Sequence, residues 1–122
     1  MTRSKGEYYF EYRVRNLLSE EGWLVIKCAS SRPYDIIAIK KNVAIPIEIK
    51  HKDGYYPKDQ EEKQIDLGQK TQNNYLLLWQ SNQRGKIEYK KYNIKEDEFY
   101  NKLLRSLLLD LGMENGRLLK LD

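Results

Sequence analysis

The stretch DIIAIKKNVAIPIEIK, residues 35–50, predicts two apolar β-strands joined by a short polar turn. We place the turn at residues 41–42, so that the strands pair outward from it until Asp35 lies opposite Glu48. Directly opposed residues share one face of a hairpin, and Lys50 shares that face with Glu48 because side chains alternate along a strand. Pro46 has no backbone N–H to donate, which favours an edge position or a bulge at that point.

The two carboxylates on this face need a compensating charge. At about 5 Å and an effective dielectric constant of about 20, they repel each other by roughly 3 kcal/mol. Either one carboxyl group is protonated, or a cation lies between the two. Lys50 provides one positive charge, and a hard divalent cation such as Mg²⁺ would provide more. The alternative is that a strand-end Asp and a Glu-x-Lys pattern are ordinary surface features of a half-exposed hairpin.

Glu11 is a candidate third carboxylate. It lies three residues before Val14 and seven before Leu18, on the stripe of a predicted helix that faces the sheet. A buried charge is normally paired or bound to a metal. The alternative places Glu11 at the edge of the stripe, where its side chain reaches solvent past Tyr8 or Tyr12.

The rest of the chain completes a mixed α/β domain around one sheet, with the element order αβββαββα. The predicted elements outside the hairpin are a helix from an N-cap at Ser4 to a stop at Gly22, a buried strand at 23–27, a helix at 59–72 with Asp59 as N-cap, strands at 75–80 and 86–92, and a helix from Asn93 to near Gly112.

Composition limits the class of protein. A chain of 122 residues predicts a single domain over residues 1–122. One cysteine excludes an internal disulfide and favours a reducing compartment, and the amino terminus has no signal-peptide pattern. No apolar run approaches the ~20 residues of a membrane span. A net charge of +4, with ten Lys or Arg against six Asp or Glu in residues 1–52, suggests a polyanionic partner.

Four parts of the sequence carry a family resemblance. Glu11, EEGWLVIK at 20–27, DIIAIK at 35–40 and IEIK at 47–50 together resemble the archaeal-type Holliday junction resolvases, which belong to the PD-(D/E)xK nuclease superfamily. The resemblance implies a restriction-endonuclease-like mixed five-stranded sheet flanked by helices. It also implies a homodimer that acts on four-way DNA junctions in the cytoplasm. The compact size suggests a short member carried by an archaeal virus, which would act in the cytoplasm of the host cell.

The resemblance also assigns the site residues. Asp35 and Glu48 match the metal-binding carboxylates, and Lys50 matches the catalytic lysine. Glu11 matches an acid on the first helix that completes the metal site, and the backbone carbonyl of Ile49 is a further ligand. The implied cofactor is Mg²⁺, with Mn²⁺ as a substitute.

Basic and aromatic residues around this site predict a DNA-binding surface. The loop HKDGYYPK at 51–58 combines cations for phosphates with rings for base stacking. The resemblance adds Gln60 and a serine, Ser30 or Ser31. The candidate DNA-contacting residues are Arg3, Lys5, Arg13, Arg15, Ser31, Arg32, Lys52, Tyr55, Tyr56, Lys58 and Gln60. We interpret His51, the only histidine, as a solvated residue after a strand, with a metal or catalytic role as the alternative.

The last predicted helix has an unusually wide apolar stripe. Its members are Phe99, Leu103, Leu104, Leu107, Leu108 and Leu111, with Tyr100 and Leu109 beside them. One interpretation is packing on the sheet of the same chain. The other, which we favour from the width of the stripe, is a contribution to the seam of an obligate homodimer.

These observations favour a structure-selective endonuclease that resolves four-way junctions by Mg²⁺-dependent hydrolysis with paired symmetric nicks. Three alternatives stay open: another DNA endonuclease of the superfamily, of restriction or repair type; a non-catalytic nucleic-acid-binding module of the same fold; and a basic interaction protein with no DNA role. The intact carboxylates and Lys50 count against the non-catalytic module.

Overall fold

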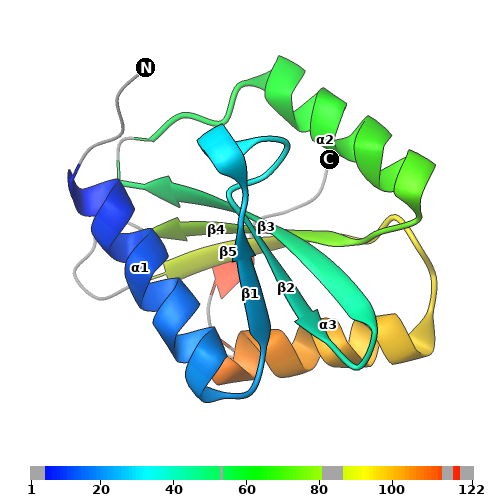
Figure 1. The fold of residues 1–122 in the computed structure, drawn as a ribbon. Helices are drawn as coiled ribbons and strands as arrows, with labels where there is room; N and C mark the ends of the chain where they lie inside the picture. Colours follow the sequence, from blue (N-terminus) through cyan, green and yellow to red (C-terminus); the bar gives the residue numbers. More distant parts are fainter. Residues whose placement is uncertain (1–4, 53, 81–86, 114–116, 119–122) are drawn as a thin grey trace.

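The computed structural model describes residues 5–52, 54–80, 87–113 and 117–118 (Figure 1). Its elements are α1 (Lys5–Glu20), β1 (Leu24–Lys27), a 3₁₀ turn η1 (Ala29–Ser31), β2 (Ile36–Lys40), β3 (Val43–His51), α2 (Lys58–Thr71), β4 (Tyr75–Gln80), β5 (Ile87–Tyr92), α3 (Glu98–Asp110) and β6 (Arg117–Leu118). The predicted order of helices and strands is confirmed, and η1 and the two-residue β6 were not predicted.

The central hairpin has the predicted turn and register. Lys41 and Asn42 both have left-handed backbone conformations, with φ of 52° and 66°, as a two-residue type I′ turn requires. Lys40 pairs with Val43, and the register continues to Ile36 opposite Ile47. Asp35 therefore immediately precedes β2 on the face that Glu48 shares.

Pro46 lies in the central strand β3 at a point where one side of the strand is unpaired, so the predicted bulge is wrong and the predicted edge position holds locally. Pro46 pairs with Ile37 in an unbroken register. Because the pair that closes a two-residue turn is hydrogen-bonded, alternation makes the Ile37–Pro46 pair a non-hydrogen-bonded one. The proline nitrogen therefore faces β4, but pairing with β4 begins only at Ile47 opposite Leu76. The missing N–H removes no bond from either ladder.

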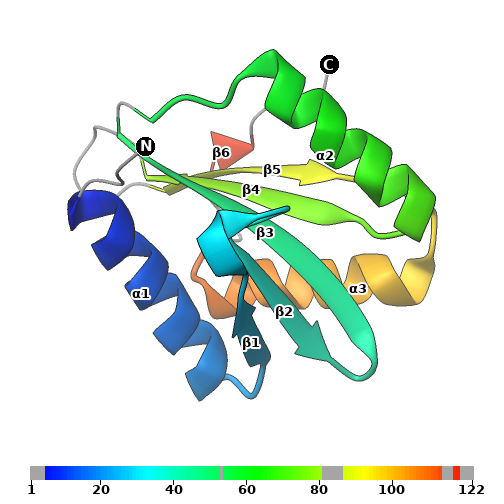
Figure 2. The ribbon, with the colours of Figure 1, turned by 45° about the horizontal axis from the view of Figure 1, so that its top comes forward.

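The sheet is mixed, with the strand order β1-β2-β3-β4-β5-β6. β3 and β4 are parallel, because α2 connects them across one face of the sheet, whereas β1–β2, β2–β3 and β4–β5 are antiparallel. α1 and α3 cover the opposite face (Figure 1, Figure 2). The predicted α/β sheet flanked by helices is thus confirmed.

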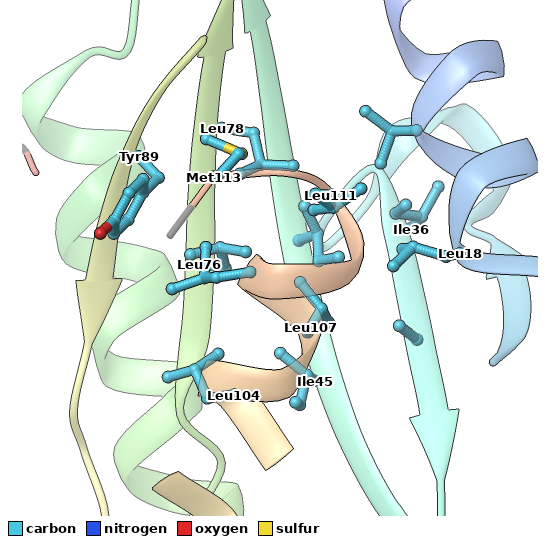
Figure 3. Packing of buried hydrophobic residues seen from close by; sticks show 14 of the residues in the cluster. Leu18, Ile36, Ile45, Leu76, Leu78, Tyr89, Leu104, Leu107, Leu111 and Met113 are labelled. Atoms are coloured by element: carbon cyan, nitrogen blue, oxygen red, sulfur yellow. The ribbon is translucent and has the colours of Figure 1, made fainter. Parts of the chain in front are cut away.

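The two faces of the sheet bury different kinds of residue. The odd-numbered residues of β3, such as Ile45, face the larger core with aliphatic side chains from β4, α1 and α3 (Figure 3). The even-numbered Glu48 and Lys50 point the other way, toward α2. That second face holds a smaller cluster built around Tyr34, Tyr75 and Tyr92. Glu48 and Lys50 therefore lie in a layer that contains hydroxyl groups as well as apolar surface, whereas Glu11 lies on α1.

Three local predictions need correction. β1 is an edge strand rather than a buried one, with Leu24 60% and Ile26 44% exposed. α2 begins at Lys58 after Pro57, so Asp59 lies in the first turn and is no N-cap. α3 begins at Glu98, well after Asn93. Its N-cap is Asp97, whose side chain accepts a hydrogen bond from the Tyr100 N–H at 3.1 Å. Ser4 lies outside the described residues.

The apolar stripe of α3 packs inside its own chain. Leu103, Leu104, Leu107, Leu108 and Leu111 are all buried in the larger core. The stripe is wide because α3 packs against both the sheet and α1. The interpretation of the stripe as a dimer seam is therefore wrong for these leucines, and packing on the chain's own sheet is confirmed. Of the apolar residues of this helix, only Phe99 and Leu109 are exposed, at 50% and 46%.

Over the part of the chain that the structure describes, every helix falls short of the length and apolar character needed to cross a bilayer.

Candidate active site

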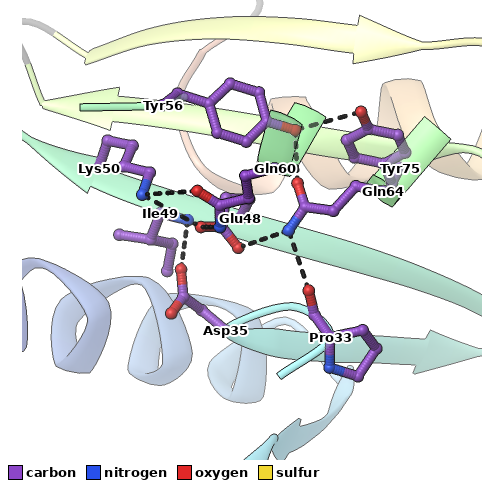
Figure 4. A network of polar contacts seen from close by, with 9 residues as sticks. All are labelled: Pro33, Asp35, Glu48, Ile49, Lys50, Tyr56, Gln60, Gln64 and Tyr75. Carbon is purple, nitrogen blue, oxygen red and sulfur yellow. Dashed lines mark hydrogen bonds and ion pairs between the residues drawn. The ribbon is translucent and has the colours of Figure 1, made fainter. Parts of the chain in front are cut away.

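The hairpin brings two carboxylates together beside α2 (Figure 4). Asp35 and Glu48 are each only 3% exposed. The backbone N–H of Ile49 donates to Asp35 Oδ2 at 2.7 Å, which ties the Asp35 side chain to β3. The Cys28 N–H donates to the Asp35 carbonyl at 3.0 Å and fixes the backbone from the other side. The predicted Asp35–Glu48 face therefore exists, and it is buried rather than half-exposed.

Lys50 and Gln60 complete this group. The Lys50 Nζ lies 3.4 Å from Glu48 Oε2 and 3.5 Å from Gln60 Oε1. The Gln60 amide donates to Glu48 Oε2 at 2.9 Å. The structure thus places Gln60, predicted only as a residue near the active site, in direct contact with both Glu48 and Lys50.

The electrostatics of the pair favour a bound cation. The pKa of Glu48 is raised to about 7, first by burial and then by the negative charge of Asp35; the charge of Lys50 and hydrogen bonds from Gln64 and Lys50 oppose the rise. Lys50 therefore compensates only part of the negative charge. A divalent cation bound by oxygen ligands would compensate the rest.

The available ligands suit Mg²⁺. Among the described residues, no three His, Cys, Asp or Glu side chains group closely enough to hold a metal ion. The candidates beside α2 are two carboxylates, Asp35 and Glu48, and the carbonyl of Ile49, while Glu11 is a separate candidate on α1. Mg²⁺ is typically bound through one or two carboxylates, with waters and substrate phosphates in the other positions. The donor set fits that ion.

Glu11 is fully buried on α1, so the alternative in which it reaches solvent is wrong. Its carboxylate forms ion pairs with Lys27 at 3.5 Å and with Arg15 at 3.6 Å. The pKa of the Cys28 thiol is raised, mainly by burial and also by the charges of Asp35, Glu48 and Glu11. All three carboxylates therefore lie within electrostatic range of one thiol. A metal-binding role for Glu11 stays a prediction.

Tyr56 and His51 differ from their predicted environments. Tyr56 points inward: its hydroxyl bonds the Gln64 amide oxygen, and its ring lies 5.8 Å from the Lys50 Nζ. Its neighbour Tyr55 is 75% exposed and is the ring available for stacking. His51 ends β3 half-buried, with its imidazole against Gly6, where an added Cβ would lie 2.2 Å from His51 Cε1. His51 is therefore a packing residue.

The other DNA-contacting candidates differ in exposure. Arg13, Arg32, Lys52 and Lys58 are exposed, whereas Arg15 is half-buried in its ion pair with Glu11. Arg3 and the side chains of Lys5 and Ser31 lie outside the described part. A cavity of about 660 Å³ opens beside Gln60. It is lined by Ser30, Arg32, Pro33, Asp59, Gln60 and Lys63.

Sequence analysis missed two residues near the site, Lys63 and Gln64. Gln64 is 3% exposed, and its amide donates to Glu48 Oε1 at 3.1 Å. The available signal was spacing: Gln60 and Gln64 are four residues apart, which places both on one face of a helix.

Comparison with known proteins identifies a family and a similar fold. The sequence model of the archaeal Holliday junction resolvase family matches residues 1–103. Among solved structures, the fold is similar to that of a Holliday junction resolvase from Archaeoglobus fulgidus. The TM-score is 0.58 and the sequence identity 19%, and the match covers 78% of this chain and 80% of the other. No curated protein matches the chain.

Proposed function

The chain belongs to the archaeal Holliday junction resolvase family. We propose that it is an endonuclease that cuts four-way DNA junctions by metal-dependent hydrolysis, with Asp35, Glu48 and Lys50 as the active-site residues. The observation that carries this proposal is the buried pair of carboxylates with incompletely compensated charge. A surface hairpin with no metal would have no reason to bury two acids side by side.

The chain's own groups divide the work of hydrolysis. Asp35, Glu48 and the Ile49 carbonyl would hold a divalent ion, which when bound would supply Lewis-acid polarisation of the phosphate and a lowered pKa for water. Lys50, 3.4 Å from Glu48, lies where its ammonium can orient that water and offset the charge of the transition state. The oxygen of water bonds to phosphorus as the bond to the 3′-oxygen breaks; the water gives up a proton to solvent and the 3′-oxygen takes one up, which leaves a 5′-phosphate and a 3′-hydroxyl. Mg²⁺ is the proposed ion, with Mn²⁺ as a substitute.

We place the DNA along the basic surface next to this site. The cavity beside Gln60 has two cations, Arg32 and Lys63, on its rim, and such side chains position phosphates without reading sequence. The exposed Tyr55 adds a ring for stacking on an unpaired base near the branch point.

We further propose a homodimer that makes paired symmetric nicks, because a junction has two-fold symmetry and each nick needs one active site. The seam lies outside the buried stripe of α3. Exposed apolar side chains remain on β1, at Leu24 and Ile26. Sedimentation equilibrium at micromolar concentration tests the proposal, and a monomer that still nicks both strands in concert would contradict it.

The remaining proposals concern the whole chain. We propose a single nuclease domain over residues 1–122 and a location in the cytoplasm. An origin in an archaeal virus stays a prediction.

One experiment tests the activity directly. The protein is incubated with a mobile four-way junction, a linear duplex and a single strand of matched sequence, each with Mg²⁺ or with EDTA. We expect cleavage of the junction only, and only with Mg²⁺. Asp35→Asn should lose cleavage and most metal binding but keep junction binding, whereas Asp66→Asn, at an exposed acid of α2, should behave like the wild type. Equal cutting of the linear duplex would favour the restriction or repair alternative.

A further inference from the structure

Both the nitrogen and the oxygen of the Gln64 side-chain amide form hydrogen bonds inside the site. The nitrogen donates to Glu48 Oε1 at 3.1 Å and to the Pro33 carbonyl at 2.9 Å, and the oxygen accepts a hydrogen bond from the Tyr56 hydroxyl (Figure 4). The Tyr34 hydroxyl donates to the Gln64 backbone carbonyl at 2.9 Å. An amide has two hydrogens to donate and one oxygen to accept with, so its donors and its acceptor are all engaged.

These bonds join three segments that the sequence keeps apart. Glu48 is in the middle of β3, Pro33 stands two residues before Asp35, and Tyr56 is in the loop between β3 and α2. Gln64 therefore contacts one proposed metal ligand directly and the backbone that leads into the other.

We infer that Gln64 is a positioning residue for the metal site, which holds Glu48 and the Asp35 segment so that both carboxylates face one cation. The inference rests on the proposed function, because it takes these carboxylates as the ligands. A neutral donor suits this task. A lysine at this position would compete with the cation for Glu48, and a carboxylate would repel it.

Tyr56 extends this connection to the proposed catalytic lysine. Its hydroxyl bonds Gln64 and lies 3.2 Å from the Tyr75 hydroxyl, and its ring is 5.8 Å from the Lys50 Nζ. One side chain of the loop thus contacts both the residue that orients Glu48 and the lysine beside it. The conformation of the loop at Tyr56 sets the geometry of both.

The test measures Mg²⁺ binding without DNA, as the Mg²⁺-induced rise in the thermal-unfolding midpoint. Gln64→Met keeps the length of the side chain but removes every amide bond. We expect the Mg²⁺ concentration for a half-maximal rise to increase at least ~10-fold, as is typical when a group that orients a metal ligand is lost. Excess Mg²⁺ should restore cleavage, and junction affinity in EDTA should stay unchanged.

Tyr34→Phe is the matched control, because it removes a buried hydrogen bond to the same residue but leaves the amide intact. It should lower the unfolding midpoint and leave the Mg²⁺ dependence unchanged. Tyr56→Phe should shift the Mg²⁺ dependence in the same direction as Gln64→Met, by a smaller factor, and it decides the matter if Gln64→Met fails to fold.

Wild-type Mg²⁺ dependence in both Gln64→Met and Tyr56→Phe would overturn the inference. A wild-type protein that neither binds Mg²⁺ nor cuts a junction would instead overturn the proposed function on which it rests.

Discussion

Glu48→Gln should abolish cleavage and yet stabilise the metal-free protein at high pH. In the folded protein the pKa of Glu48 is raised from 4.5 to about 7, first by burial and then by the charge of Asp35. The fold therefore favours the neutral form of Glu48. Gln carries no charge at any pH, so it removes the cost of ionising this group inside the protein.

The sign and the size follow from linkage. An acid whose pKa is higher in the folded than in the unfolded protein does not lower the free energy of unfolding at a pH below the unfolded pKa. As the pH rises from the unfolded pKa to the folded pKa, the free energy of unfolding falls. At about 1.4 kcal/mol per pH unit, the interval from 4.5 to about 7 corresponds to roughly 3 kcal/mol. The wild type should lose this free energy of unfolding as the pH rises through that window, and Glu48→Gln should not.

The assay is urea unfolding of both proteins in metal-free buffer from pH 4.5 to pH 8. The comparison uses the change in the mutant-minus-wild-type difference between these limits, because hydrogen bonds lost to Gln60 and Gln64 contribute at every pH. We expect that difference to move by roughly 3 kcal/mol in favour of the mutant. For Asp35→Asn, the mutant-minus-wild-type difference should change in the same direction but by less. Burial is the larger cause of the raised Glu48 pKa, and this substitution leaves Glu48 buried.

Two further measurements make the reasoning refutable. Glu62→Gln changes an exposed acid of α2, so its free energy of unfolding should run parallel to that of the wild type across the pH range. Mg²⁺ at ten times its Kd should stabilise the wild type at pH 8 by about 1.4 kcal/mol, and Glu48→Gln by much less. Parallel pH profiles for the wild type and Glu48→Gln would show that Glu48 is not held in its neutral form, and the argument for a cation would fail.

Further outcomes follow from other parts of the structure. Lys50→Ala should cut orders of magnitude more slowly in a single-turnover assay while Mg²⁺ binding persists; equal loss of both would make Lys50 structural. Junction affinity, measured by fluorescence anisotropy, should fall steeply with log salt because phosphate contacts release counterions, and a flat profile would speak against the basic surface. Leu104→Ala should lower the free energy of unfolding by about 2–5 kcal/mol without changing the association state, because this side chain is buried in its own chain. Gly6→Ala gains about 1 kcal/mol of helix propensity but must displace the imidazole of His51, so in the same urea assay it should stabilise the His51→Ala variant more than the wild type.

The hairpin could be predicted because its determinants are local. A polar dipeptide that tolerates positive φ, between two alternating apolar runs, fixes both the turn and the register. Once the register was set, the Asp35–Glu48 pairing followed with no knowledge of the rest of the fold. The acid on α1 followed from periodicity alone, since a helix stripe that faces a sheet is buried whatever lies beyond it.

The errors arise where tertiary packing decides. An apolar run such as residues 23–27 predicts a strand but does not say whether anything covers it, and here β1 is the last strand of the sheet. The stripe of α3 looked too wide for one partner because the sequence does not show that α3 also packs against α1. For Pro46 the sequence left an edge position and a bulge both open, because the effect of a missing N–H depends on where the neighbouring strand begins to pair.

The sequence pattern does not predict a role for Gln64, for a different reason. An amide in a helix adds nothing to an apolar stripe and leaves no charge to explain, so its role exists only in the folded contacts. The absence of charge on Gln64 matters for the site.

Asp35 and Glu48 carry two negative charges when ionised, and Lys50 carries one positive charge. α2 presents the amides of Gln60 and Gln64 to Glu48, while its Lys58 and Lys63 are exposed to solvent. Had either amide been a lysine, the acids would be neutralised within the protein and a cation would gain little by binding. Neutral donors orient the carboxylate without cancelling its charge. With both acids ionised, the site therefore keeps a net charge of about −1, which raises its affinity for a metal ion.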